Sequence, residues 1–260
     1  MISASDFICG DKFLSLESSD ILYIKTDMVK LGLNELNWRG KIRKIRPAKI
    51  WITGHSAYPI DKTIFDKYQH NCQRWFATNK LCNNEKIQAL PIGITNDTKE
   101  TVMHPIYGNT DIMIQTMNKP RSLKNLVYLN FNVATFKEDR IPCFNYFKDK
   151  PWVTVGSNIQ TLDGRRTFLE EIRNHKFSIC PRGAGVDTHR LWETLYMGSI
   201  PVVIKHEALM EFNDLPILFI DKWTDVTEEF LNKKYDEMQE IQWNMDKLKF
   251  SYWENVIRFS

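Results

Sequence analysis

Short apolar runs alternate with amphipathic stretches along the chain. The first part has three apolar runs of strand length, at residues 21–24, 50–53 and 86–91. Five more follow in the second part, at residues 125–132, 152–156, 177–181, 200–204 and 216–220. Nearly continuous apolar strands separated by helical stretches are typical of parallel sheets with helices on both faces. The pattern therefore predicts an α/β protein.

Helices are predicted where apolar positions recur every three or four residues. This spacing occurs within residues 61–79, at 166–175 and 189–197, and twice in the tail at 226–259. Two polar stretches punctuated by Gly and Pro, residues 34–49 and 93–111, are predicted to be loops. Basic residues surround Trp38 in the first of them. Binding of an acceptor glycan or a lipid surface by this segment is therefore the alternative to a solvated loop.

The order of the elements predicts two doubly wound units, residues 1–118 and 119–240, and a closing helix at 241–260 that packs back on the first unit. Units of this kind open their ligand crevices at the carboxyl ends of the strands. Two crevices that face each other form a cleft. A single larger sheet is the alternative that counting strands leaves open.

Composition narrows the class of protein. The 35 basic and 32 acidic residues leave a net charge of +3, too small for the field of a nucleic-acid-binding protein. The five cysteines are scattered without a C-x-x-C pair, which argues against a zinc site and favours a reducing compartment. No apolar run approaches the ~18 residues of a membrane helix. A soluble, cytoplasmic protein without a transmembrane segment is expected.

Glycine and charge are concentrated at residues 180–203, CPRGAGVDTHRLWETLYMGSIPVV. The pattern predicts a strand, a turn through Gly183 and Gly185, a helix capped by Asp187 or Thr188, and a second strand. A backbone without Cβ atoms can pass close to a ligand, and the first N–H groups of a helix attract anions. The turn is therefore a candidate site for a diphosphate, although it matches neither common nucleotide-binding glycine motif.

Arg190 and Glu193 lie on the polar side of this predicted helix, opposite Leu191, Trp192 and Leu195. An arginine near a helix start can pair with phosphate oxygens. A carboxylate one turn later can accept hydrogen bonds from two ribose hydroxyls. The alternative is an ordinary surface ion pair between Arg190 and Glu193.

Residues 176–203 resemble the donor-site signature of exostosin-like glycosyltransferases, including the short, soluble members encoded by large DNA viruses such as chloroviruses. The resemblance is weaker in three other segments, residues 76–79, 90–94 and 128–140. The resemblance implies a GT-B fold, in which two Rossmann-like domains face each other across a cleft. It also implies a nucleotide sugar held by the C-terminal domain, transfer with inversion, and no required metal.

The resemblance also implies roles for residues. Together with the helix cap, the implied diphosphate and sugar site comprises Arg182, Gly183, Gly185, Asp187, Thr188, His189 and Arg190, with the ribose at Glu193. Candidates for further donor contacts are Asn130, Asn132, Arg140, Gly156, Arg165 and Arg166, of which the arginines could equally support the fold. The chain has no Asp-x-Asp pair, which commonly holds a cation against a diphosphate, so the leaving group would rely on arginines and the helix end.

A UDP-sugar is the expected donor and a glycan hydroxyl the expected acceptor. UDP-xylose is the first choice, followed by UDP-glucuronate or a UDP-hexose, with GDP-fucose as a further option. A nucleotide-sugar-binding protein without catalysis is the alternative from another class. A viral member would act in the host cytoplasm.

Inverting transfer needs a base that takes the proton of the acceptor hydroxyl. His55 follows the strand at 50–53, and its ordinary pKa of ~6.5 suits this role. Asp61 is a second candidate, unless it caps a helix. The relatives are expected to have an acidic residue near Ala57, so either the base lies elsewhere or alanine replaces an aspartate. In the second case, an aspartate at position 57 is expected to raise turnover by orders of magnitude.

Overall fold

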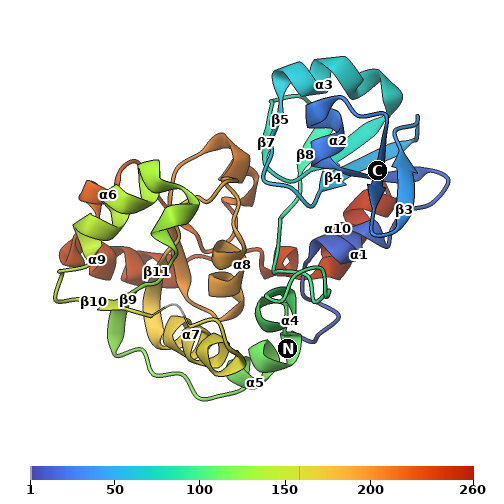
Figure 1. Ribbon diagram of the computed structural model, residues 1–260. Helices are drawn as coiled ribbons and strands as arrows, with labels where there is room; N and C mark the ends of the chain where they lie inside the picture. The colour runs from blue at the N-terminus through green and yellow to red at the C-terminus, as the bar shows by residue number, and fades with distance from the viewer. Residues whose placement is uncertain (1, 158) are drawn as a thin grey trace.

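The computed structural model describes residues 2–157 and 159–260, and the predicted α/β class is confirmed there. Two all-parallel sheets form in different regions of the molecule (Figure 1). The four-stranded sheet has the order β1 (Ile21–Lys25), β4 (Ile50–Gly54), β6 (Arg74–Ala77) and β8 (Ile87–Ala89). The five-stranded sheet has the order β10 (Val153–Val155), β9 (Asn125–Leu129), β11 (His175–Ile179), β12 (Ile200–Ile204) and β13 (Leu218–Ile220). Each predicted apolar run thus contains or overlaps a strand.

Helices connect and cover the strands. They are α1 (Gly10–Leu14), α2 (Thr26–Leu31), α3 (Lys62–Tyr68), α4 (His104–Tyr107), α5 (Thr110–Met117), α6 (Lys137–Phe147), α7 (Leu162–Asn174), α8 (His189–Tyr196), α9 (Glu228–Gln239) and α10 (Phe250–Arg258). The two helices predicted in the tail are α9 and α10. No helix of the described residues is long and apolar enough to cross a membrane.

The strand order of the five-stranded sheet reverses beside β9. The chain forms β9 first, adds β10 on one side, and then adds β11, β12 and β13 on the other. This order is compatible with a Rossmann-like fold, in which the ligand crevice lies where the order reverses, beyond the carboxyl ends of the two central strands. The residues that follow β9 and β11 are therefore the ones to inspect, and the Gly-rich turn follows β11.

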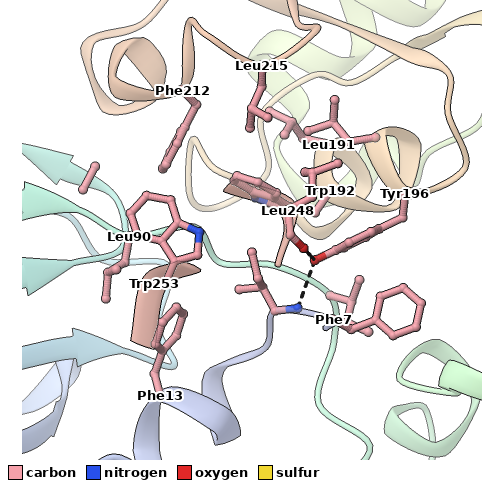
Figure 2. Close-up of a cluster of buried hydrophobic side chains, with 14 of the residues drawn as sticks. Phe7, Phe13, Leu90, Leu191, Trp192, Tyr196, Phe212, Leu215, Leu248 and Trp253 are labelled. Atoms are coloured by element: carbon pink, nitrogen blue, oxygen red, sulfur yellow. Dashed lines mark hydrogen bonds between the residues drawn. The ribbon is translucent and has the colours of Figure 1, made fainter. Parts of the chain in front are cut away.

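One buried apolar cluster contains side chains from both sheets and from the C-terminal helix. Figure 2 shows part of this cluster, including Phe7, Tyr196 and Trp253. Tyr196 of α8 lies inside it, where its Oη accepts a hydrogen bond from Ile8 N (3.0 Å) and donates one to Leu248 O (2.8 Å). Helix α10 lies beside α1 (Figure 1), and the rings of Phe13 and Phe250 are 5.5 Å apart. The N-terminal segment, α8 and the C-terminal helix thus share a core.

Both predicted loops contain regular structure. Residues 34–49 form an antiparallel hairpin of β2 (Glu35–Trp38) and β3 (Lys41–Lys44). Its two-residue turn, Arg39 and Gly40, has positive φ at both positions, as the turns that suit hairpin twist require. A short parallel pair, β5 (Ile60–Asp61) and β7 (Lys80–Leu81), was likewise not predicted.

The prediction of an unbroken loop at 93–111 is wrong because local capping and burial form helices there. Helix α4 lies inside this stretch and α5 begins at Thr110. Asn109 caps α5, since its Oδ1 accepts a hydrogen bond from Ile112 N (3.0 Å). Ile112 and Met113 are buried in the shared core. Helix α5 spans only eight residues, Thr110–Met117, so its apolar positions repeat too few times to give a clear periodic signal.

Candidate functional site

Two adjoining cavities lie between the carboxyl ends of the two sheets. The β4 cavity, of about 310 Å³, is lined by the end of β4 and the segments around it, including Tyr23, His55, Asn96 and Glu100. The α8 cavity, of about 410 Å³, is lined by residues that follow β9 and β11 and by the start of α8, including Asn130, Arg140, Gly183 and Arg190. Both volumes lie in the range of small-molecule sites. The residues that line both cavities are Ala57, Ile92, Gly185, Asp187 and His189.

Arg190 brings an unpaired positive charge to the α8 cavity. Its guanidinium carbon lies 4.4 Å from the centre of the Phe168 ring, a cation–π contact that orients the side chain. Its Nη1 is buried and has no hydrogen-bond partner among the described residues. Burial lowers the pKa of Arg190, which the carboxylate of Glu193 partly opposes. A buried N–H without a partner is costly, so this group is suited to an anionic ligand.

Glu193 is held by a different arginine than the one considered in the sequence. Its Oε1 lies 2.8 Å from Nη1 of Arg165 on α7, and both side chains are buried. Nη2 of Arg165 also donates to Tyr107 O (2.9 Å). The alternative of a surface pair between Arg190 and Glu193 is therefore wrong. Glu193 still lines the α8 cavity one turn beyond Arg190.

The Gly-rich turn is bound by a residue of the other sheet. Asn79 follows β6, and its Oδ1 accepts hydrogen bonds from Val186 N and Asp187 N, both at 2.9 Å. Asn79 is buried and has a φ of 52°, a conformation that asparagine tolerates better than most residues. The N–H groups of Val186 and Asp187, just before α8, are therefore not available to an anion. Leu191 N donates to Thr188 O (3.1 Å), so the groups that remain for an anion are the backbone N–H groups of His189 and Arg190 and the Arg190 side chain.

Gly185 is required by the closeness of Asn79. A Cβ at position 185 would lie 2.8 Å from Asn79 Nδ2, whereas a Cβ at Gly183 would meet nothing closer than Arg140 Nη2 at 3.3 Å. We expect Gly185→Ala to lower the free energy of unfolding by about 1–3 kcal/mol, as overpacking does. Gly183→Ala, the matched control in the same turn, is expected to lower it less. Urea unfolding measures both free energies. Equal losses in the two variants would show that the Asn79 side chain moves aside at little cost and that Gly185 is not required.

At the start of α8, both carboxylate oxygens of Asp187 are already hydrogen-bonded. Oδ2 of Asp187 accepts a hydrogen bond from Ile92 N and Oδ1 accepts one from Trp192 Nε1, both at 2.7 Å. Burial raises the pKa of Asp187 to about 7, against these hydrogen bonds, which lower it. Thr188 is the N-cap residue, but its side chain makes no cap hydrogen bond. Asp187 thus ties α8 to the segment after β8.

Arg140 braces the point where the strand order reverses. It donates from Nε to Arg182 O (2.8 Å) and from Nη1 to Asn132 O (2.7 Å), which joins the segments after β9 and β11. Burial lowers its pKa to about 10. Asn130, which donates to Tyr128 Oη and Ser157 O, lines the same cavity.

Other predicted donor contacts point elsewhere. The guanidinium of Arg182 stacks on Phe136 at 4.4 Å and lines a separate cavity of about 140 Å³. Arg166 donates to Gln115 Oε1 (3.0 Å) on α5. Gly156 lies against the Tyr128 hydroxyl, which a Cβ would meet at 2.2 Å. These three residues support the fold rather than line the α8 cavity.

In the β4 cavity, both ring nitrogens of His55 are already bonded. Nε2 lies 2.9 Å from Asp11 Oδ1, and Nδ1 contacts the Tyr23 hydroxyl. Since a carboxylate only accepts, Nε2 carries the proton and Tyr23 donates to Nδ1. Arg39 from the hairpin tip pairs with Asp11 and with Glu100. His55 therefore has no free lone pair for a substrate proton.

The two other base candidates lie in different places. Asp61 caps α3, since its Oδ1 accepts a hydrogen bond from Ile64 N (2.9 Å), and it lines neither cavity. Of the two roles considered for it, the cap is the one it has. Ala57 lies where the two cavities meet, and it brings only a methyl group there.

Residues that contact the site but lie far from it along the chain were missed in the sequence analysis. Asp11, Tyr23 and Arg39 surround His55, but no spacing along the chain relates them. Asn79 carried a usable signal, because it is a polar residue at the carboxyl end of a parallel strand. Comparison of the chain with protein-family models and with curated proteins finds no match.

Proposed function

We propose that the chain is a glycosyltransferase that moves a sugar from a nucleoside diphosphate to a glycan hydroxyl with inversion. In this proposal the two sheets form the two domains of a GT-B fold. The diphosphate lies in the α8 cavity, and the acceptor enters through the β4 cavity. The observation that carries the proposal is the guanidinium of Arg190, whose buried Nη1 has no hydrogen-bond partner in the described part of the chain, in a cavity where the strand order reverses.

Three features support this assignment of the α8 cavity. Its position beyond the carboxyl ends of β9 and β11 is where open parallel sheets bind ligands. Arg190 and the first turn of α8 supply positive charge to a leaving diphosphate, so the proposal requires no metal. The carboxylate of Glu193, fixed by Arg165, is available deeper in the cavity for ribose hydroxyls.

The donor follows from the family resemblance of residues 176–203. A UDP-sugar is proposed, with UDP-xylose first and GDP-fucose as a further option. We expect UDP at a hundredfold above its Kd to stabilise the protein by about 2.7 kcal/mol in thermal unfolding. The shift is expected to persist in EDTA and to be smaller with GDP and ADP. No shift with any nucleoside diphosphate would contradict the proposal.

A second candidate function is a nucleotide-sugar-binding protein without catalysis. The methyl group of Ala57 between the cavities and the fully bonded ring of His55 favour it. Measuring free UDP after incubation with UDP-sugars, with and without glycan acceptors, separates the two functions. Transferase activity releases UDP, whereas a binding protein takes up the donor and leaves it intact.

A further inference from the structure

His189 lies where a proton acceptor for the proposed transfer is needed. It is the first residue of α8 and it lines both cavities. In the proposed function, the acceptor hydroxyl and the anomeric carbon meet at the boundary between these cavities. A base has to reach the hydroxyl at that boundary.

The hydrogen bond of His189 determines which ring nitrogen is free. Nδ1 lies 2.8 Å from Gly93 O, and a carbonyl oxygen only accepts, so Nδ1 carries the proton. In the neutral ring, Nε2 then keeps its lone pair. The anchor is tightly placed: Gly93 has a φ of +68°, and a Cβ there would lie 2.1 Å from Ile8 O.

The surroundings of His189 keep its ring neutral. Burial lowers the pKa of His189, an effect that the Gly93 carbonyl and the carboxylate of Glu193 partly oppose. The other charged or titratable groups around it are Arg165, Arg190, His104, Asp187 and Glu100. A neutral imidazole near pH 7 can accept a proton at once.

Two other candidate proton acceptors are already engaged, His55 in the β4 cavity and Asp187 at the boundary. Both nitrogens of His55 and both carboxylate oxygens of Asp187 already have hydrogen-bond partners. Ala57 has no polar atom in its side chain. Among the described residues that line both cavities, His189 is thus the one with a ring nitrogen left to accept a proton.

We propose that Nε2 of His189 is the general base of the transfer, an inference that rests on the proposed function. The acceptor O–H bond breaks as its proton moves to Nε2, and the oxygen forms a bond to the anomeric carbon. The bond from that carbon to the diphosphate oxygen breaks, and its electron pair leaves with the nucleoside diphosphate. The imidazolium then returns its proton to water.

Two variants test the role of His189. In His189→Asn, the amide nitrogen can keep the hydrogen bond to Gly93 while the base is lost. We expect kcat for UDP release from the donor to fall by about 10²- to 10⁴-fold, with the UDP Kd within threefold of the wild type. In His189→Ala, added imidazole is expected to raise kcat at least tenfold above the value without imidazole. A purely structural role of His189 would not allow this rescue. His70→Gln, at an exposed histidine, is the matched control.

Three outcomes would overturn the assignment. If kcat of His189→Asn stays within threefold of the wild type, His189 is not the base. If the variant loses only UDP affinity, His189 is a phosphate ligand instead. A kcat of Ala57→Asp that is a hundredfold above the wild type shows that the wild-type chain lacks its base. Failure of the proposed function is distinguishable, because then the wild type itself shows no UDP binding or releases no UDP.

Discussion

Arg190→Met is expected to weaken UDP binding by about 10- to 150-fold, equivalent to about 1.5–3 kcal/mol, without lowering the stability of the free protein. A hydrogen bond from a charged donor to a phosphate contributes this much. Methionine keeps an apolar contact with Phe168 but removes the buried Nη1, which has no hydrogen-bond partner within residues 2–157 and 159–260. Removing an unsatisfied buried donor relieves a cost of folding. The variant is therefore expected to be at least as stable as the wild type.

Calorimetric titration with UDP and urea unfolding of the ligand-free protein measure the two effects. Arg258→Met, at a half-exposed arginine of α10 paired with Glu254, is the matched control and is expected to leave the UDP Kd unchanged. The opposite pattern would contradict the proposed site. If Arg190→Met lowers stability and leaves UDP affinity intact, then Arg190 serves the packing around Phe168 instead of a ligand.

Apart from β6 (Arg74–Ala77), the strands of the two parallel sheets were predictable because burial on both faces leaves nearly continuous apolar runs, such as residues 200–204. The hairpin at 35–44 was not, because its strands are largely exposed and its residues mostly polar. Its turn at Arg39 and Gly40 carried the only local signal. Helices α4 and α5 escaped for a related reason, since each is short and α5 depends on the cap at Asn109.

The site was predictable only as far as chain neighbours determine it. The strand–turn–helix order of residues 177–196 and the direction of Arg190 into a cavity follow from local periodicity. The partner of Glu193 does not, because Arg165 comes from another helix. Nor does the engagement of the Val186 and Asp187 N–H groups by Asn79, which is 107 residues away from the first of them. Such contacts arise from how the sheets pack, which periodicity along the chain does not encode.

Arg165→Met is expected to lower the free energy of unfolding by about 3–5 kcal/mol. Arg165 is fully buried against Glu193, and its loss leaves a carboxylate inside the protein without its cation. The double variant Arg165→Met with Glu193→Gln removes that stranded charge and is expected to recover most of the loss. Lys119→Met is the control: it breaks an exposed ion pair with Glu170, which lies on α7 like Arg165. It is expected to change the free energy of unfolding by less than about 1 kcal/mol.

Urea unfolding with a constant m-value measures these stabilities. A small loss in Arg165→Met would mean that Glu193 finds a second cation in Arg190, whose guanidinium already feels its charge. That rearrangement would consume the free guanidinium of the α8 cavity, so UDP affinity would fall together with the retained stability. A large loss that the double variant recovers, with UDP affinity intact in the double variant, assigns Arg165 to holding Glu193 and leaves Arg190 to the ligand.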